Sequence, residues 1–238
     1  MKKLKTKRPL FEKSHLPLYL SGLVMTLYGL AGAVMWSISS NQAMLGQITA
    51  GQMRTRIAAY ESTAGLIAGI LFFILFIWCA VKARGAARAA FIVATLAGFG
   101  PILTARAEGL LFNTLKLVLP AGSVVAGALA TLAFALPMTI AFIILASSGR
   151  LPRSCRWVSL GSIFVVILTA FFPIAVTVVA FLVKPGDPGV GRMIEVSSQI
   201  IKLRYILPGL ALILLAYFSA RFALNMQAPA ETAEGESK

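Results

Sequence analysis

Long runs of apolar residues alternate along this chain with short polar stretches that carry most of its charge. A helix needs about 20 apolar residues to cross a hydrocarbon core of ~30 Å, because it rises ~1.5 Å per residue. Six runs come close to or exceed that length, at residues 16–38, 62–81, 89–105, 119–146, 157–183 and 205–222. Their interiors contain no Asp, Glu, Lys or Arg. The pattern predicts an all-α integral membrane protein, with residues 16–226 forming a polytopic bundle of about six transmembrane helices.

Composition supports lipid as the solvent of this domain. The chain is 58% hydrophobic and 13% charged, with a mean hydropathy of +0.86. A soluble domain of this length carries about 25% charged residues and could not bury this much apolar surface.

The distribution of basic residues predicts the orientation. They are densest before the first run, after the second and after the fourth, at Lys2, Lys3, Lys5, Lys7, Arg8, Lys13; Lys82, Arg84, Arg88; and Arg150, Arg153, Arg156. The positive-inside rule then places both termini in the cytoplasm. We expect the protein to lie in the cell inner (plasma) membrane. Residues 1–15 form a basic cytoplasmic segment, and the polar residues 227–238 are expected to be a disordered cytoplasmic tail.

The net charge of +14 also bears on partners. In a soluble protein it would suggest nucleic acid. Here the basic residues lie between apolar runs, which is typical of contact with anionic lipid headgroups. We therefore expect a bilayer with anionic headgroups as the partner, and no nucleic acid.

Residues for catalysis, metal binding or cofactor binding are scarce. The chain has two cysteines, Cys79 and Cys155, and one histidine, His15, with no Cys/His cluster. No G-x-S-x-G, H-E-x-x-H or Walker A motif occurs. We expect no enzyme activity, metal or cofactor. The charge-free interiors also argue against a proton- or voltage-coupled machine.

Two segments beyond the apolar runs have loose helical spacing of apolar residues, at 41–60 and 190–204. Each is predicted to be an amphipathic helix at the outer interface, or else an extension of a neighbouring span.

Small residues recur at helical spacing in three runs and predict close helix packing. They are Gly22 and Gly29; Gly65 and Gly69; and Ser123, Gly127 and Thr131. Packing within the chain is favoured over a homodimer face.

A polar island separates the third and fourth runs, at Arg106, Glu108, Asn113 and Lys116. One interpretation is a mouth that binds an anionic headgroup or solute. The other, which we favour, is a set of interfacial charges that anchor a short loop.

Two functions fit these features. The leading hypothesis is a non-enzymatic multi-pass membrane subunit that packs with itself or with partner chains in a larger assembly. The alternative is a small permease or substrate-binding membrane subunit for an apolar or amphipathic solute or lipid. The small-residue faces favour the first, whereas the polar island and the prolines near span ends favour the second.

Overall fold

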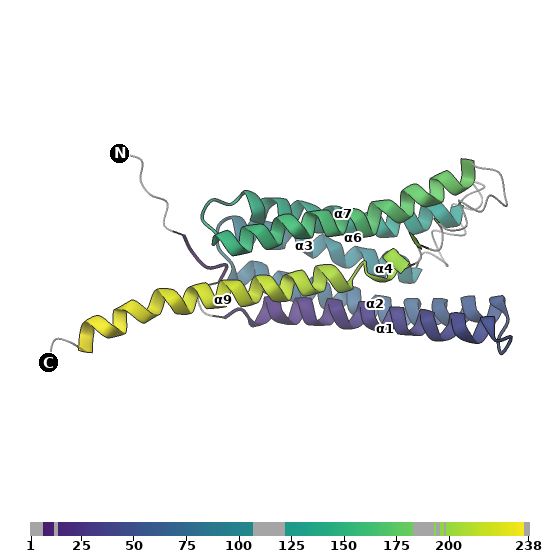
Figure 1. Ribbon diagram of the computed structural model, residues 1–238, viewed down its shortest axis with the longest axis horizontal. Helices are drawn as coiled ribbons and strands as arrows, with labels where there is room; N and C mark the ends of the chain where they lie inside the picture. The colour runs from purple at the N-terminus through teal and green to yellow at the C-terminus, as the bar shows by residue number, and fades with distance from the viewer. Residues whose placement is uncertain are drawn as a thin grey trace.

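A computed structural model describes residues 7–11, 14–106, 122–182, 193, 196–197 and 199–235. The described residues form long helices joined by short turns (Figure 1). The elements are α1 (Leu16–Met44), α2 (Ala50–Lys82), α3 (Ala86–Thr95), the 3₁₀ turn η1 (Leu96–Gly98), α4 (Phe99–Arg106), α6 (Gly122–Ser147), α7 (Arg153–Leu182) and α9 (Ile206–Gly235). Within these described residues, six segments are long and apolar enough to cross a membrane, which confirms the predicted helical class and the six candidate spans.

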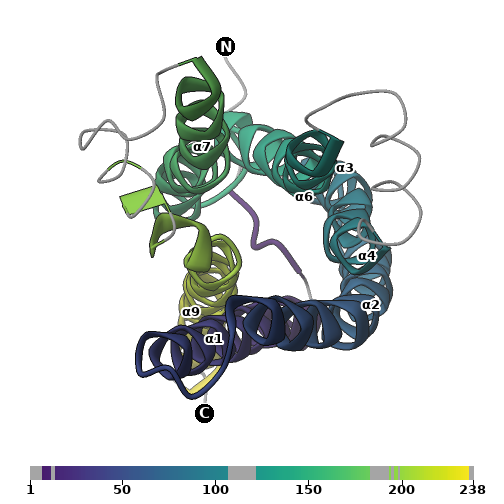
Figure 2. The same cartoon turned by 90° about the vertical axis from the view of Figure 1, so that its right-hand side faces the viewer.

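The helices form a closed ring (Figure 2). Along the chain, α1 packs on α2, and α2 packs on α3 and α4. Helices α3 and α4 pack on α6, which in turn packs on α7. Contacts of α9 with both α7 and α1 close the ring. We call the end at which α1 begins and α2 ends the basic end, and the other the opposite end.

The third span is interrupted rather than continuous. The turn η1 separates α3 from α4, and Gly98 in it faces α2 while Gly100 in α4 faces α6. A Cβ on Gly98 would lie 2.8 Å from the carbonyl oxygen of Gly69, and one on Gly100 would lie 3.0 Å from the Cα of Phe134. Glycine at these two positions lets the interrupted span fit between its neighbours.

The segment 41–60 extends the neighbouring spans, which is the second of the two predicted alternatives. Asn41 lies within α1, and α2 already begins at Ala50. The reason is a capping box: the Gln52 N–H donates to Thr49 Oγ1 at 3.2 Å, and the Thr49 N–H donates to Gln52 Oε1 at 2.9 Å. Gly46, with φ of 69°, supplies the left-handed turn after α1.

The last predicted segments differ in part from the structure. In 190–204, residues 193, 196–197 and 199–202 are helical, and residues 203–205 form a turn that interrupts the sixth span. The tail predicted to be disordered from residue 227 instead continues α9 to Gly235. Ala and Glu, which are frequent in that tail, have high helix propensity.

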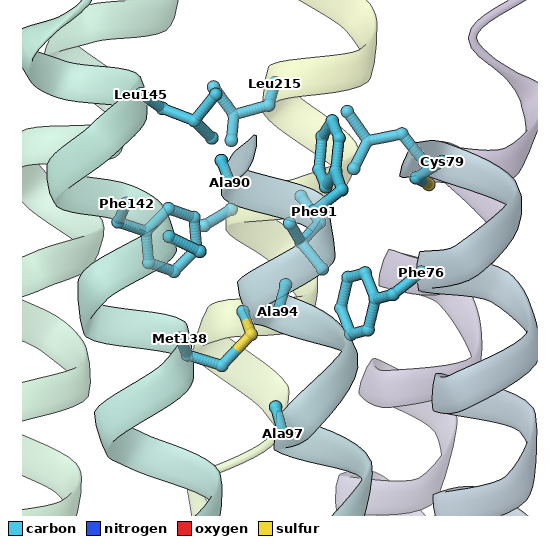
Figure 3. Packing of buried hydrophobic residues seen from close by; sticks show 14 of the residues in the cluster. Phe76, Cys79, Ala90, Phe91, Ala94, Ala97, Met138, Phe142, Leu145 and Leu215 are labelled. Atoms are coloured by element: carbon cyan, nitrogen blue, oxygen red, sulfur yellow. The ribbon is translucent and has the colours of Figure 1, made fainter. Parts of the chain in front are cut away.

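Apolar residues occupy both the inside and the outside of the ring. The interior holds large side chains that are almost fully buried (Figure 3), among them Phe76, Phe91, Phe142, Met138 and Leu145. Large apolar side chains also cover the outside; they include Leu27, Ile74, Ile92, Phe164 and Leu214. A ring that is apolar on both faces suits a lipid solvent, where only the backbone must be satisfied internally.

Helices α1 and α9 cross at close range. A Cβ on Gly22 would lie 2.5 Å from the carbonyl oxygen of Gly209, and a Cβ on Gly29 would lie 2.9 Å from the amide nitrogen of Ile206. Gly69 of α2 approaches Gly98 in the same way, and Gly65 is buried. Gly22, Gly29 and Gly69 therefore lie against other helices of the same chain.

The N-terminal segment enters the ring at the basic end (Figure 2). Leu10 and Phe11 are 2% and 1% exposed. Phe11 stacks on Phe91 with ring centroids 5.6 Å apart and forms an antiparallel β-bridge with Ala83. The segment predicted as a basic cytoplasmic extension thus includes an apolar plug.

Hydrogen bonds hold this plug in place. The Leu10 N–H donates to Ser219 Oγ of α9 at 2.7 Å, and His15 Nε2 lies 2.9 Å from the same hydroxyl. The Arg8 N–H donates to the carbonyl oxygen of Arg150 at 2.7 Å. Residues 8–15 thereby connect to both the α6–α7 turn and α9.

Candidate functional site

A cavity of about 200 Å³ lies between α1, α2 and the turn before α9, toward the opposite end. We call it the aromatic pocket. Its aromatic and charged lining residues are Tyr28, Trp36, Tyr60, Glu61, Lys202, Arg204 and Tyr205. The volume is below the ~300–1,000 Å³ typical of drug-sized ligands, so it suits a small molecule or one group of a larger one.

Tyrosines of three segments form the wall of the aromatic pocket. The Tyr60 hydroxyl donates to the backbone carbonyl oxygen of Tyr28 at 3.0 Å, and their rings stack with centroids 6.3 Å apart. Tyr28 also packs on Tyr205 at 4.9 Å, and Tyr205 packs edge-on against Phe134 at 4.6 Å. Ring-to-ring contacts thus join α1, α2, α6 and the turn before α9.

Arg204 carries a positive charge from the turn into the ring. Its guanidinium donates to Thr131 Oγ1 of α6 at 2.9 Å and lies 4.6 Å from the centre of the Tyr205 ring. Among the described residues, Arg204 Nε and the Tyr205 hydroxyl are buried without a hydrogen-bond partner. Leaving such atoms unsatisfied is costly, so each is a place where a ligand or water would bond.

The depth of Arg204 follows from its partner. Thr131 lies about 24 Å along α6 from Ser147, which ends that helix at the basic end. A hydrocarbon core is ~30 Å thick, so a bundle that entered it at the basic end would hold the guanidinium inside it. The interiors of the predicted runs contain no charged residue, but Arg204, which lies just before the sixth run, directs its guanidinium into the ring.

Two more charged residues line the aromatic pocket. Lys202 Nζ lies 4.4 Å from the centre of the Trp36 ring and donates to Gln199 Oε1 at 2.9 Å. Glu61 lies on α2, one residue after Tyr60, and is half-buried. The lining thus combines two cations, one carboxylate and several aromatic rings.

The structure leaves the predicted polar island largely unplaced. Arg106 is the last residue of α4, and its side chain is not described. Glu108, Asn113 and Lys116 lie outside the described residues.

The predicted stripe on α6 is described only from Thr131 onward. Thr131 is buried and accepts the Arg204 hydrogen bond, so it is a polar contact as well as a packing residue. The side chain of Ser123 and the surroundings of Gly127 are not described.

Sequence reasoning missed the aromatic pocket because most of its aromatic and charged residues lie at the ends of three separate runs. Each has an ordinary explanation there: aromatic residues anchor interfaces, and charged residues end spans. A usable signal was the coincidence of Trp36, Tyr60 with Glu61, and Arg204 with Tyr205, all at run ends predicted for the same side.

Comparison with protein-family models, with curated proteins and with solved structures finds no match to this chain.

Proposed function

We propose that this chain is a multi-pass membrane protein that binds a small amphipathic solute with an anionic group in the aromatic pocket. The solute's anionic group would pair with Arg204, and its apolar part would lie against Tyr28, Trp36 and Tyr60. This makes the chain a small permease or substrate-binding membrane subunit without enzyme activity. Both termini would be cytoplasmic, as the positive-inside rule predicts.

One observation carries the proposal: a guanidinium held inside the ring at the wall of a cavity. Ionisable groups at membrane depth are costly, and they mark solute or ion pathways. A guanidinium presents a planar fork of donors that matches a carboxylate or phosphate. The buried Arg204 Nε, which has no partner among the described residues, adds a donor for such a ligand.

The assembly-subunit hypothesis now has less support than the binding hypothesis. Part of its argument was the set of small-residue faces on the first, second and fourth runs. Gly22, Gly29 and Gly69 pack on other helices of the same chain, so these faces are already occupied. The two roles remain compatible, because a solute-binding chain can also belong to a complex.

Ligand binding tests the proposal with matched probes. The chain in mild detergent would be titrated with benzoate, benzyl alcohol and benzylamine, which share a ring and differ in charge. Binding would be followed by Trp36 fluorescence in a Trp78→Phe, Trp157→Phe background, since those two tryptophans lie near the basic end. We expect benzoate to bind most tightly of the three, because two cations face one carboxylate in the pocket.

The Arg204→Gln variant should lose the preference for benzoate, with an affinity loss of about tenfold or more. Arg56→Gln is the matched control, because Arg56 is an exposed arginine that donates to Gln42 outside the pocket. Equal binding of the three probes, or equal losses in the two variants, would refute the proposed site.

Mass measurement in the same detergent addresses the assembly hypothesis. A stable complex with other chains would support a subunit role, whereas a lone monomer that binds the probe would favour a permease or binding protein.

A further inference from the structure

A second cavity, of about 230 Å³, lies at the basic end, on the far side of the N-terminal plug from the aromatic pocket. We call it the basic pocket. Its polar side chains are Arg8, Lys82, Arg84, Arg150 and Ser148, and no acidic residue occurs among the described residues that line it. At ~30 Å³ per water, it has space for about seven waters, or for a phosphate group with part of its hydration shell.

Three separate segments bring these charges together. Arg8 comes from the N-terminal segment, Lys82 and Arg84 from the α2–α3 connection, and Arg150 from the α6–α7 turn. The backbone hydrogen bond from the Arg8 N–H to the Arg150 carbonyl oxygen fixes two arginines beside each other. Both side chains line the same cavity, so an anion in it would meet two guanidinium groups.

The start of α3 strengthens the preference for an anion. Gly85, Ala86 and Ala87 line the basic pocket, and α3 begins there without a side-chain cap. The first N–H groups of a helix lack partners within it and carry a partial positive charge. Phosphate groups commonly occupy this position in other proteins.

We propose that the basic pocket binds a phosphate group, which is held by Arg8, Arg150 and Lys82 and by the first turn of α3. The phosphate belongs either to a free phosphate-bearing solute or to the headgroup of an anionic phospholipid. Its binding ties the N-terminal plug to the two connections at the basic end. The site is independent of the aromatic pocket and does not depend on what that pocket binds.

Thermal unfolding of the full chain in mild detergent tests this site. Inorganic phosphate, compared with chloride at the same ionic strength, should raise the unfolding midpoint in a saturable manner. Arg8→Gln and Arg150→Gln should each weaken the apparent affinity by about tenfold, since each removes a charged donor. Arg150→Lys should keep most of the effect, because it preserves the charge, and it shows that loss in Arg150→Gln does not reflect misfolding.

Arg153→Gln and Arg221→Gln are the matched controls. Both residues are exposed, and neither lines the basic pocket. They should leave phosphate binding nearly unchanged. If they weaken binding as much as Arg8→Gln does, the attraction is diffuse and the proposed site is wrong.

A second arm distinguishes the two sources of phosphate. The chain would be placed in micelles that contain phosphatidylglycerol or phosphatidylcholine, and lipid that stays bound would be counted by native mass spectrometry. Stabilisation by inorganic phosphate alone identifies a free solute. Stabilisation only by phosphatidylglycerol, lost in Arg8→Gln, identifies a lipid headgroup. No stabilisation by either one overturns the proposal.

Discussion

At the basic end of the ring the charged side chains stay at the rim around an apolar plug, whereas at the opposite end one charge reaches the interior. The plug consists of Leu10 and Phe11, which are almost fully buried. At the other end Arg204 crosses to Thr131 between aromatic rings. One end is therefore closed by apolar contact, and the other contains a polar site within the bundle.

Under the proposed function, this difference favours access from the opposite end. A solute could reach Arg204 from the opposite end through the aromatic pocket, while the plug separates that pocket from the basic end. Substitutions can alter the two ends together or one at a time.

The largest loss of stability is expected from a substitution at the crossing of α1 and α9, the two helices that run between both ends of the ring. Gly209→Leu would place a side chain against Thr26 and the backbone of Gly22. Because neither helix backbone can move away without opening the ring, we expect a loss of about 3 kcal/mol or more. Reversible unfolding in mixed micelles would measure it.

Gly161→Leu is the control for that substitution, since a Cβ at Gly161 of α7 meets nothing within 4 Å. Its stability should stay near that of the wild type. Equal losses in the two variants would mean that the α1–α9 crossing is not a special contact.

The next effect concerns the opposite end alone. Thr131→Val removes the acceptor of the Arg204 guanidinium, and we expect a loss of about 2 kcal/mol with weaker binding in the aromatic pocket. Thr139→Val on the same helix is the comparison, because Thr139 Oγ1 is buried without a hydrogen-bond partner among the described residues. That variant should be neutral or slightly more stable. A larger loss of stability in Thr139→Val than in Thr131→Val would contradict the role given to Arg204.

A smaller effect should be confined to the basic end. Ser219→Ala leaves the buried Leu10 N–H without its acceptor, which should cost about 1–2 kcal/mol and loosen the plug. A thiol reagent would measure the loosening in a Leu10→Cys background, where labelling should accelerate. Ser62→Ala, at an exposed hydroxyl of α2, should leave the labelling rate unchanged. Equal rates in both backgrounds would mean that Ser219 does not hold the plug.

The smallest effect is a pH dependence of the free energy of unfolding, which we expect from His15 at the basic end. Burial lowers the pKa of His15, which lies beside Ser219 just before the first span. The unfolded chain then takes up a proton at higher pH than the folded chain, so the free energy of unfolding should fall as pH drops below about 6.5. His15→Gln should flatten this fall in the unfolding midpoint. An unchanged slope would assign the acid sensitivity to other groups.

The apolar runs were enough to predict the helical class and the six candidate spans, because a run of that length has few alternatives. We took charged residues as the ends of the spans, however, and the structure departs from this rule at two places. Ala50–Tyr60 belongs to α2 despite Arg54 and Arg56, because the capping box at Thr49 starts the helix earlier. The sixth run was predicted to begin at Tyr205, which excluded Arg204 from the span. In the structure the Arg204 side chain nevertheless points into the ring.

Long-range contacts were also beyond prediction. Nothing near Leu10 in sequence indicates that its amide would bond to Ser219, and the apolar pair Leu10–Phe11 within a basic segment was the only hint. The interruption at η1 depends on how closely Gly69 and Phe134 approach from two sides, which a single span does not encode.

The closed ring has a consequence for the order of assembly during synthesis. Each span packs on the one made before it, so most of the bundle can form as the chain emerges. The hydrogen bond that joins the plug to α9 cannot, because Leu10 and its partner Ser219 are separated by 209 positions. At ~5–20 residues per second, the N-terminal segment waits roughly 10–40 s for that partner to be made. Closure of α1 on α9 and the Leu10–Ser219 hydrogen bond are therefore among the last contacts to form.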